Sequence, residues 1–351
     1  MNAIKFEPNR VWRAYLGGAG IDCLRGTPPG TDGRFPEDWI ASCVEANNPQ
    51  YDCPGQGLSR VKVEAGEASF RDLLAAHPEW TRPAGSETGI LMKILDSAER
   101  LPIQVHPTVE DAKRYFRSTH GKTECWIVLG TRVVNGEEPY LLLGFNPALD
   151  RDRFLAEART GVFDAGAKML HRLVVKPGDA ILVPGGTPHA IGPGVTVIEV
   201  MEPSDLVVQP ELRCGEQPLS LSERFSGADP EDAFKAFDFL PETEAELKAR
   251  CFHAPEELVR EPGGNLQRLI PLASNGFFEV RKLCVSGEFD LVNREKCCRA
   301  GVVTAGELEL NAGGETLSLR CGDGFFLPAG LADCTFRGRG EAVLALPHYG
   351  F

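Results

Sequence analysis

This 351-residue sequence lacks two features and is short of a third, and each of these shortages argues against a class of protein. It has no run of about 18 apolar residues, so we expect no membrane-spanning helix. Basic residues are outnumbered, with 37 Lys and Arg against 50 Asp and Glu, and the formal net charge of −13 argues against a nucleic-acid surface. Residues 1–8 contain no apolar core of a secretory signal, so we expect a cytoplasmic protein.

The eleven cysteines also lack a pattern, because no two of them form a Cys-X-X-Cys pair. Cys297 and Cys298 are adjacent, and adjacent cysteines rarely bridge each other. In the cytoplasm the expected state is a reduced, mostly buried thiol rather than a thiol metal site or a redox switch. The remaining composition, 42% hydrophobic and 25% charged, is that of an ordinary globular protein whose length allows two domains.

Polar side chains gather in the stretch of residues 101–126. Gln104 and His106 lie two residues apart in a short β-rich run, so both point to one face of a strand. Lys122 and Glu124 share a face in the same way in a second β-rich run. An apolar core does not place an amide, an imidazole and a carboxylate side by side. Nitrogen and oxygen ligands of this kind suit a divalent, zinc-like metal ion.

A further ligand is offered by His189 in the run 184–190 (Pro-Gly-Gly-Thr-Pro-His-Ala). Residues 174–184 before it read as strand, turn and strand, with Pro-Gly-Asp as the turn signal. The Pro-Gly-Gly bend then places His189 at the start of the next strand, as in a small β-barrel that presents a histidine to a pocket. One metal ion would satisfy all of these hydrophilic groups on inward strand faces. The Gln104 amide can serve as the fourth ligand or can equally orient another ligand from outside. The predicted metal ligands are Gln104, His106, Glu124 and His189.

These segments resemble the type I mannose-6-phosphate isomerases, in the short bacterial form built on cupin barrels without a large inserted helical domain. The resemblance rests on four segments that occur in order: Gln-Val-His-Pro (104–107), Gly-Lys-Thr-Glu-Cys-Trp (121–126), Val-Pro-Gly-Gly-Thr-Pro-His-Ala-Ile-Gly (183–192) and Glu-Pro-Ser-Asp-Leu-Val-Val (202–208). It is dense over residues 100–210 and weak beyond 260. It implies a zinc-dependent isomerase with one Zn²⁺ per chain. The implied reaction interconverts mannose 6-phosphate and fructose 6-phosphate by a proton transfer through an enediol.

One later β-rich run repeats an earlier segment. Residues 322–330 (Gly-Asp-Gly-Phe-Phe-Leu-Pro-Ala-Gly) repeat the form of residues 178–186 (Gly-Asp-Ala-Ile-Leu-Val-Pro-Gly-Gly). The sequence therefore predicts a mainly β fold of two cupin-like β-barrels (jelly rolls) with a few short helices. We expect a metal-binding cupin domain over 1–225, a helical connector over 226–259 and a C-terminal cupin-like domain over 260–351.

The second copy of the repeat differs from the first at the ligand position. In the register of the repeat, Asp333 stands where the first copy has His189. No second run with the form Gln-X-His or Lys-Thr-Glu accompanies it. We therefore expect the second barrel to be structural and to bind no metal.

Four further residues are candidates for catalysis or substrate binding. The resemblance favours Lys122 as a pocket lysine that meets a sugar hydroxyl or phosphate, against a solvated or paired lysine. Asp205 belongs to the matching Ser-Asp pair, although an Asp after Ser also commonly caps a turn. The family has an arginine assigned to catalysis five positions after that serine, where this sequence has the uncharged Gln209. Arg213, four residues further on, could reach the site if Pro210 redirects the backbone.

Two functions therefore remain open. The first is a zinc-dependent isomerase that acts on a small-molecule sugar phosphate. The second is a divergent cupin that binds a sugar or sugar phosphate with lost or altered isomerase activity, and Gln209 favours it. Neither function predicts a nucleic-acid or membrane partner, and the oligomeric state is left open. Of the other histidines, His171 and His253 are expected in the core.

Overall fold

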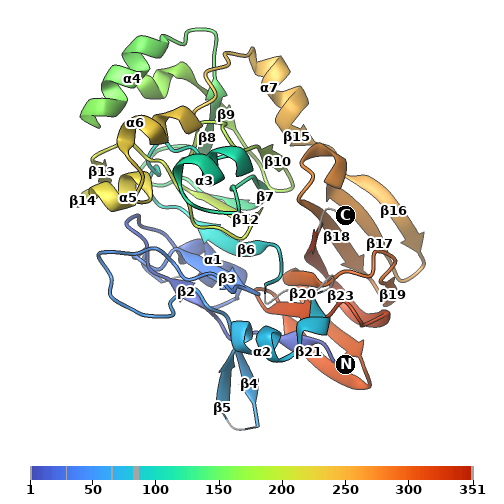
Figure 1. Ribbon diagram of the computed structural model, residues 1–351. Coiled ribbons are helices and arrows are strands. Elements are labelled where there is room, and N and C mark those ends of the chain that lie inside the picture. The colour runs from blue at the N-terminus through green and yellow to red at the C-terminus, as the bar shows by residue number, and fades with distance from the viewer. Residues whose placement is uncertain (1, 29, 65, 82–86, 349–351) are drawn as a thin grey trace.

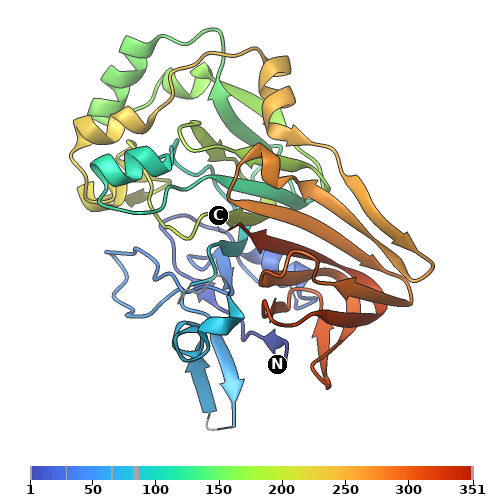
Figure 2. The same ribbon diagram turned by 45° about the vertical axis from the view of Figure 1, so that its right-hand side comes forward.

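The computed structural model describes residues 2–28, 30–64, 66–81 and 87–348, and β-strands predominate in it (Figure 1). The blue-to-yellow part of the chain forms one β unit with helices gathered over one end. The orange-to-red part forms a second β unit, which lies beside the first in both views (Figures 1 and 2). The prediction of a mainly β fold with a few short helices is confirmed.

Two antiparallel sheets form the first unit and share one apolar core. The larger sheet has the strand order β15-β10-β7-β12-β6-β3-β2, and the smaller has the order β11-β8-β9. Trp126 from the larger sheet and Leu141 from the smaller are both fully buried in the same cluster. The strands of the larger sheet are β2 (Arg10–Val11), β3 (Glu37–Ile40), β6 (Leu91–Asp96), β7 (Glu124–Thr131), β10 (Ala180–Val183), β12 (Val195–Met201) and β15 (Phe252–His253). Those of the smaller sheet are β8 (Tyr140–Phe145), β9 (Leu170–Val174) and β11 (His189–Ile191).

The second unit is one sheet with the order β1-β22-β20-β23-β18-β17-β16, to which β19 and β21 add along β23 and β20. Its two long strands, β20 and β23, pair over most of their length, so the sheet bends around its own apolar core. The first strand of the chain also belongs here, because Ile4 pairs with Phe326. The strands are β1 (Ile4–Lys5), β16 (Glu256–Glu261), β17 (Gly264–Ile270), β18 (Phe278–Val285), β19 (Glu288–Val292), β20 (Arg299–Ala312), β21 (Glu315–Arg320), β22 (Gly324–Leu327) and β23 (Asp333–Pro347).

A shared apolar cluster joins the two units. Phe70 contacts Phe6 edge to face at 4.9 Å between ring centroids and Phe326 at 5.0 Å, and all three rings are buried. Ile94 of β6 and Val343 of β23 belong to the same cluster. Burial of this much apolar surface holds the units in a fixed relation, because separating them would expose it to water.

The helices are short and most begin at a side-chain cap. At the start of α3, the hydroxyl of Thr108 accepts a hydrogen bond from the backbone N–H of Asp111 at 3.1 Å. Helices α3, α4, α5 and α6 gather at one end of the first unit (Figure 1). The α-helices are α1 (Ala19–Leu24), α2 (Phe70–Ala76), α3 (Val109–Tyr115), α4 (Arg151–Thr160), α5 (Leu221–Phe225), α6 (Pro230–Ala233) and α7 (Glu244–Cys251). Single 3-10 turns are η1 (Pro78–Trp80), η2 (Gly166–Met169), η3 (Phe234–Ala236) and η4 (Leu272–Ser274).

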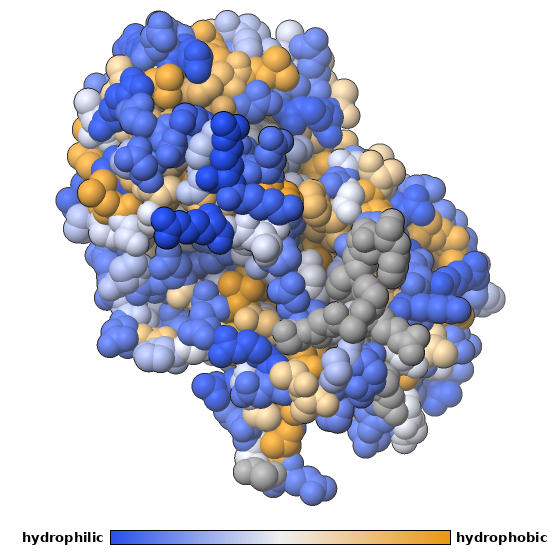
Figure 3. All heavy atoms as spheres, viewed as in Figure 1, coloured by the Kyte–Doolittle hydropathy of each residue, from blue (hydrophilic) through white to orange (hydrophobic). Residues whose placement is uncertain are grey.

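Two small hairpins and the surface complete the fold. The hairpin of β4 (Arg60–Val63) and β5 (Gly66–Ser69) projects from the molecule in Figure 1, and β13 (Arg213–Cys214) pairs with β14 (Gln217–Pro218). Hydrophilic residues cover most of the face seen in Figure 3, with hydrophobic ones interspersed. Within the described residues, every helix is too short or too polar to cross a membrane.

The two copies of the repeated segment have the same local structure. Gly178 and Gly322 both adopt a left-handed φ, 94° and 88°, and strands β10 and β22 each begin two residues later. His189 then begins β11 and Asp333 begins β23, but His189 is fully buried and Asp333 is exposed. The repeat therefore reflects equivalent structure.

The three-part division at residues 225 and 260 stays a prediction. The pairing of β1 with β22 adds the start of the chain to the C-terminal sheet. The expected helical connector contains α6 and α7, and α7 leads directly into β15, which pairs with β10 of the first unit.

Candidate functional site

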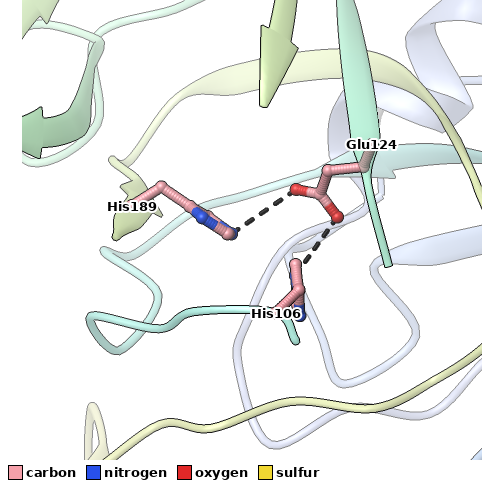
Figure 4. A group of neighbouring side chains, drawn as sticks. All are labelled: His106, Glu124 and His189. Carbon is pink, nitrogen blue, oxygen red and sulfur yellow. Dashed lines mark ion pairs between the residues drawn. The ribbon is translucent and has the colours of Figure 1, made fainter. Parts of the chain in front are cut away.

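His106, Glu124 and His189 meet inside the first unit, as the spacing of the sequence predicts (Figure 4). Glu124 is the first residue of β7 and His189 the first of β11, while His106 lies between the β-bridges at 104–105 and α3. Nε2 of His106 lies 3.2 Å from Oε2 of Glu124, and Nε2 of His189 lies 3.4 Å from Oε1. All three side chains are almost completely buried.

Hydrogen bonds fix both imidazoles with Nε2 toward the carboxylate. Nδ1 of His106 donates to the carbonyl of Leu206 at 2.8 Å, and Nδ1 of His189 donates to that of Thr187 at 2.9 Å. Burial lowers the pKa of His106 to about 4, helped by the Lys122 ammonium, and burial also lowers the pKa of His189. Both rings are therefore neutral at pH 7 and present lone pairs at Nε2.

These lone pairs face a carboxylate that can only accept. Burial would raise the pKa of Glu124, but the charge of Lys122 holds it well below its usual value, so the group is ionised. Oε1 of Glu124 and Nε2 of His189 are buried without a hydrogen-bond partner. Two ligand atoms about 2.1 Å from a tetrahedral ion lie about 3.4 Å apart, which is close to the two observed separations. The three residues thus fit a divalent metal ion.

Lys122 and Gln104 stand beside the three residues. The Lys122 ammonium donates to Nε2 of His106 at 2.6 Å and to Oε2 of Glu124 at 2.8 Å, and its side chain is buried. Gln104 exchanges two backbone hydrogen bonds with His189, at 2.8 and 2.9 Å, which sets the position of that histidine. The side chains of Gln104, His106 and Lys122 all line one pocket. Whether the Gln104 amide binds the metal stays a prediction.

A pocket open to solvent adjoins this group through His106, Gln104 and Lys122. Its walls come from segments far apart in the sequence, including the loop that carries Asn47 and Asn48. Charged side chains contribute much of the lining. The basic ones are Arg13, Lys93 and Lys122, and the acidic ones are Glu37, Glu199, Asp205 and Glu223.

Five of these charged residues form a cluster, of which only Asp205 was a candidate from the sequence. Nζ of Lys93 lies 3.3 Å from Oε1 of Glu199, 3.6 Å from Oε2 of Glu37 and 3.8 Å from Oδ1 of Asp205. Nε of Arg13 lies 3.0 Å from Oε2 of Glu37. A signal for part of this cluster was present, because Lys93 has only apolar neighbours within two residues on either side in β6, and Glu199 is the single charge in β12. The pairing of β12 with β6 places Glu199 directly opposite Lys93, and this register cannot be read from either strand alone.

The remaining predicted residues have different positions relative to the pocket. Asp205 lies at its wall, where its carboxylate accepts two-pronged hydrogen bonds from Arg13 and one from the backbone N–H of Asn47. Gln209 also lines the pocket, and its amide donates to the carbonyl of Glu223 at 3.0 Å. Arg213 is exposed in the β13–β14 hairpin, and its guanidinium donates to the carbonyl of Glu216 in that hairpin. The structure therefore does not bring Arg213 into the pocket.

Comparisons with known proteins agree on one group. Residues 272–347 match the family model "Mannose-6-phosphate isomerase, cupin domain". The chain is 28% identical over 274 residues to the probable mannose-6-phosphate isomerase GmuF of Bacillus subtilis, an alignment covering 77% of this chain and 79% of that protein. It is 26% identical over 274 residues to the mannose-6-phosphate isomerase ManA of the same organism, covering 74% and 76%.

The fold agrees as well. The crystal structure of the mannose 6-phosphate isomerase from Bacillus subtilis superposes with a TM-score of 0.76 and 23% identity, covering 99% of this chain and 100% of that one. The agreement extends over both β units, so the cupin-like fold is confirmed. The resemblance found in the sequence is confirmed too: the chain is related to the type I mannose-6-phosphate isomerases.

Proposed function

We propose that the chain is a metal-dependent aldose–ketose isomerase that interconverts mannose 6-phosphate and fructose 6-phosphate, with Zn²⁺ as the metal. The carrying observation is the buried group of His106, Glu124 and His189, in which two imidazole lone pairs and a carboxylate converge, with His106 also lining the adjoining pocket. The names of the relatives support the isomerase class and mannose 6-phosphate as the substrate.

The three residues would hold the ion, with Gln104 as a candidate fourth ligand. When bound, the metal supplies a Lewis acid that stabilises negative charge developing on a sugar oxygen. Lys122, which lines the pocket beside them, provides a hydrogen-bond donor for a sugar hydroxyl. His106, Glu124, His189 and Lys122 fit this task because all four are buried, and a low-dielectric site strengthens each electrostatic contact.

A proton must also move between C2 and C1 of the sugar. Glu199 offers a carboxylate on the pocket wall, and no hydrogen bond reaches its buried Oε1. The nearby Lys93 ammonium balances the negative charge of this buried carboxylate. In this proposal Glu199 takes and returns the proton, and Lys122 holds the sugar oxygen.

The test is a coupled assay on the purified protein loaded with Zn²⁺, with mannose 6-phosphate as substrate. We expect turnover that is lost after chelation and returns when Zn²⁺ is added. Absence of turnover in a folded protein shown by metal analysis to hold one Zn²⁺ per chain would rule the proposal out.

A second candidate is a cupin that binds a sugar or sugar phosphate with lost or altered isomerase activity. Gln209 favours it, because the amide is neutral and already bound to the carbonyl of Glu223. The coupled assay together with binding calorimetry separates the two candidates, because a protein that has lost the activity binds the sugar phosphate and shows no turnover. The cytoplasmic location expected from the sequence stays a prediction.

A further inference from the structure

Arg13 is a guanidinium of the pocket that no motif of the sequence singled out. It lies two residues after β2, and its side chain lines the pocket together with Asp205 and Glu37. We propose that Arg13 is a positioning residue of the isomerisation: by binding Asp205 and Glu37 together, it leaves Lys93 to pair with Glu199. This inference rests on the proposed function and concerns residues away from the metal ligands.

The contacts of Arg13 are those of a rigid fork. Its Nη2 lies 2.9 Å from Oδ1 of Asp205 and its Nη1 lies 3.1 Å from Oδ2, while Nε lies 3.0 Å from Oε2 of Glu37. The plane of the guanidinium stands over the Trp39 ring, with 5.1 Å to the ring centroid. A lysine has one ammonium and cannot reproduce two parallel contacts to one carboxylate and a third to another.

The contacts of Arg13 determine which carboxylates pair with Arg13 and which pairs with Lys93. Three carboxylates lie within 4 Å of the Lys93 ammonium, those of Glu199, Glu37 and Asp205. Arg13 contacts Glu37 and Asp205 more closely than Lys93 does, so those two carboxylates are compensated by the guanidinium. Glu199 is the nearest of the three to Lys93, at 3.3 Å.

Neither of the two residues expected to provide or replace an arginine can do this. Gln209 carries no charge, and Arg213 bonds to its own hairpin outside the pocket. Arg13 and Asp205 are 192 residues apart in the chain, so only the fold brings them together. The matching Ser-Asp pair of the sequence thus has a partner here, and the partner comes from the first strands of the domain.

Loss of Arg13 would leave the buried Glu37 and the partly buried Asp205 with Lys93 as their nearest cation. Lys93 would then be drawn from Glu199, because buried carboxylates need compensation. We expect Arg13→Ala to lower kcat by about 100-fold, the scale of one lost electrostatic contact in an active site. The KM for the sugar phosphate should change much less, since Arg13 acts through other side chains. Arg13→Lys should recover only part of the loss.

Chemical rescue distinguishes positioning from a general loss of structure. Guanidinium ion at concentrations far below those that denature should restore part of the kcat of Arg13→Ala. The matched control is Arg25→Ala, which removes a guanidinium–carboxylate pair of 2.6 Å with Asp38 on the opposite face of β3, outside the pocket lining. That variant should lose stability, keep its kcat and show no rescue.

The outcomes separate this inference from the proposed function. An active wild type with an unchanged Arg13→Ala, or a loss that appears only in KM, overturns the inference and leaves the isomerase intact. A wild type that holds Zn²⁺ and shows no turnover overturns both. If Arg13→Ala does not fold, Asp205→Asn removes the same charge pair at constant size, and an unchanged kcat in that variant also overturns the inference.

Discussion

The Lys122 ammonium stands between two predicted metal ligands, 2.6 Å from Nε2 of His106 and 2.8 Å from Oε2 of Glu124. A divalent ion bound to the same atoms would repel it, so metal and ammonium compete for one place. We expect Lys122→Met to bind Zn²⁺ about tenfold more tightly, because the competing charge is gone. The kcat of the same variant should fall about 100-fold, because methionine cannot donate a hydrogen bond to the sugar oxygen. Chelator competition and the coupled assay measure the two effects, and weaker Zn²⁺ binding would contradict the competition.

Glu124 carries the only charge among the three converging side chains at neutral pH. Replacing it by glutamine keeps the size but removes the charge that draws a cation, so we expect Zn²⁺ affinity to fall by at least about 100-fold. Metal analysis after dialysis tests this. His171→Gln is the control, since Nε2 of His171 binds the carbonyl of Glu242 away from the site. Equal metal content in both variants would place the ion elsewhere.

Acid should destabilise the protein through Glu37. Burial would raise its pKa, but the charges of Arg13 and Lys93 bring it down to about 2, from an ordinary value of 4.5. A carboxyl with a lowered pKa contributes stability that is fully present above about pH 4.5 and is lost as the pH falls toward 2. We expect the contribution at pH 7 to be up to about 3 kcal/mol. Urea unfolding of wild type and Glu37→Gln at pH 7 and pH 3 checks this, and a difference that stays constant between the two would disprove it.

Arg213 and Gln209 should respond differently to substitution. Arg213→Ala removes an exposed hairpin contact, so kcat/KM should stay within about twofold of wild type. Gln209→Arg introduces a guanidinium into the pocket lining, where it can pair with a phosphate, and the KM for mannose 6-phosphate should fall. Steady-state kinetics of both variants provides the comparison. A large loss in Arg213→Ala would show that the hairpin moves to bring this side chain inward.

Much of the site could be predicted from local sequence. The two-residue spacing of Gln104 and His106, and of Lys122 and Glu124, indicated shared strand faces, and the Pro-Gly-Gly bend placed His189 at the start of a strand. His106 and Lys122 lie outside the strands, just after the bridges at 104–105 and just before β7. The placement of His189 followed from turn chemistry, which is a local property. The repeat at Gly178 and Gly322 indicated two related β units for the same reason.

Only the tertiary structure decided which charges meet. Arg213 was the nearest arginine in sequence to Gln209, which stands where the family has an arginine. The β13–β14 hairpin turns Arg213 toward solvent. Arg13 reaches Asp205 because β2 and β3 lie at the edge of the larger sheet, next to β6 and the segment that follows β12. The sequence by itself determined the residue types of the candidate metal site and the β character of the chain. The partners of Lys93, Glu199 and Arg13 depend on strand order and register, which are long-range properties that no local pattern specifies.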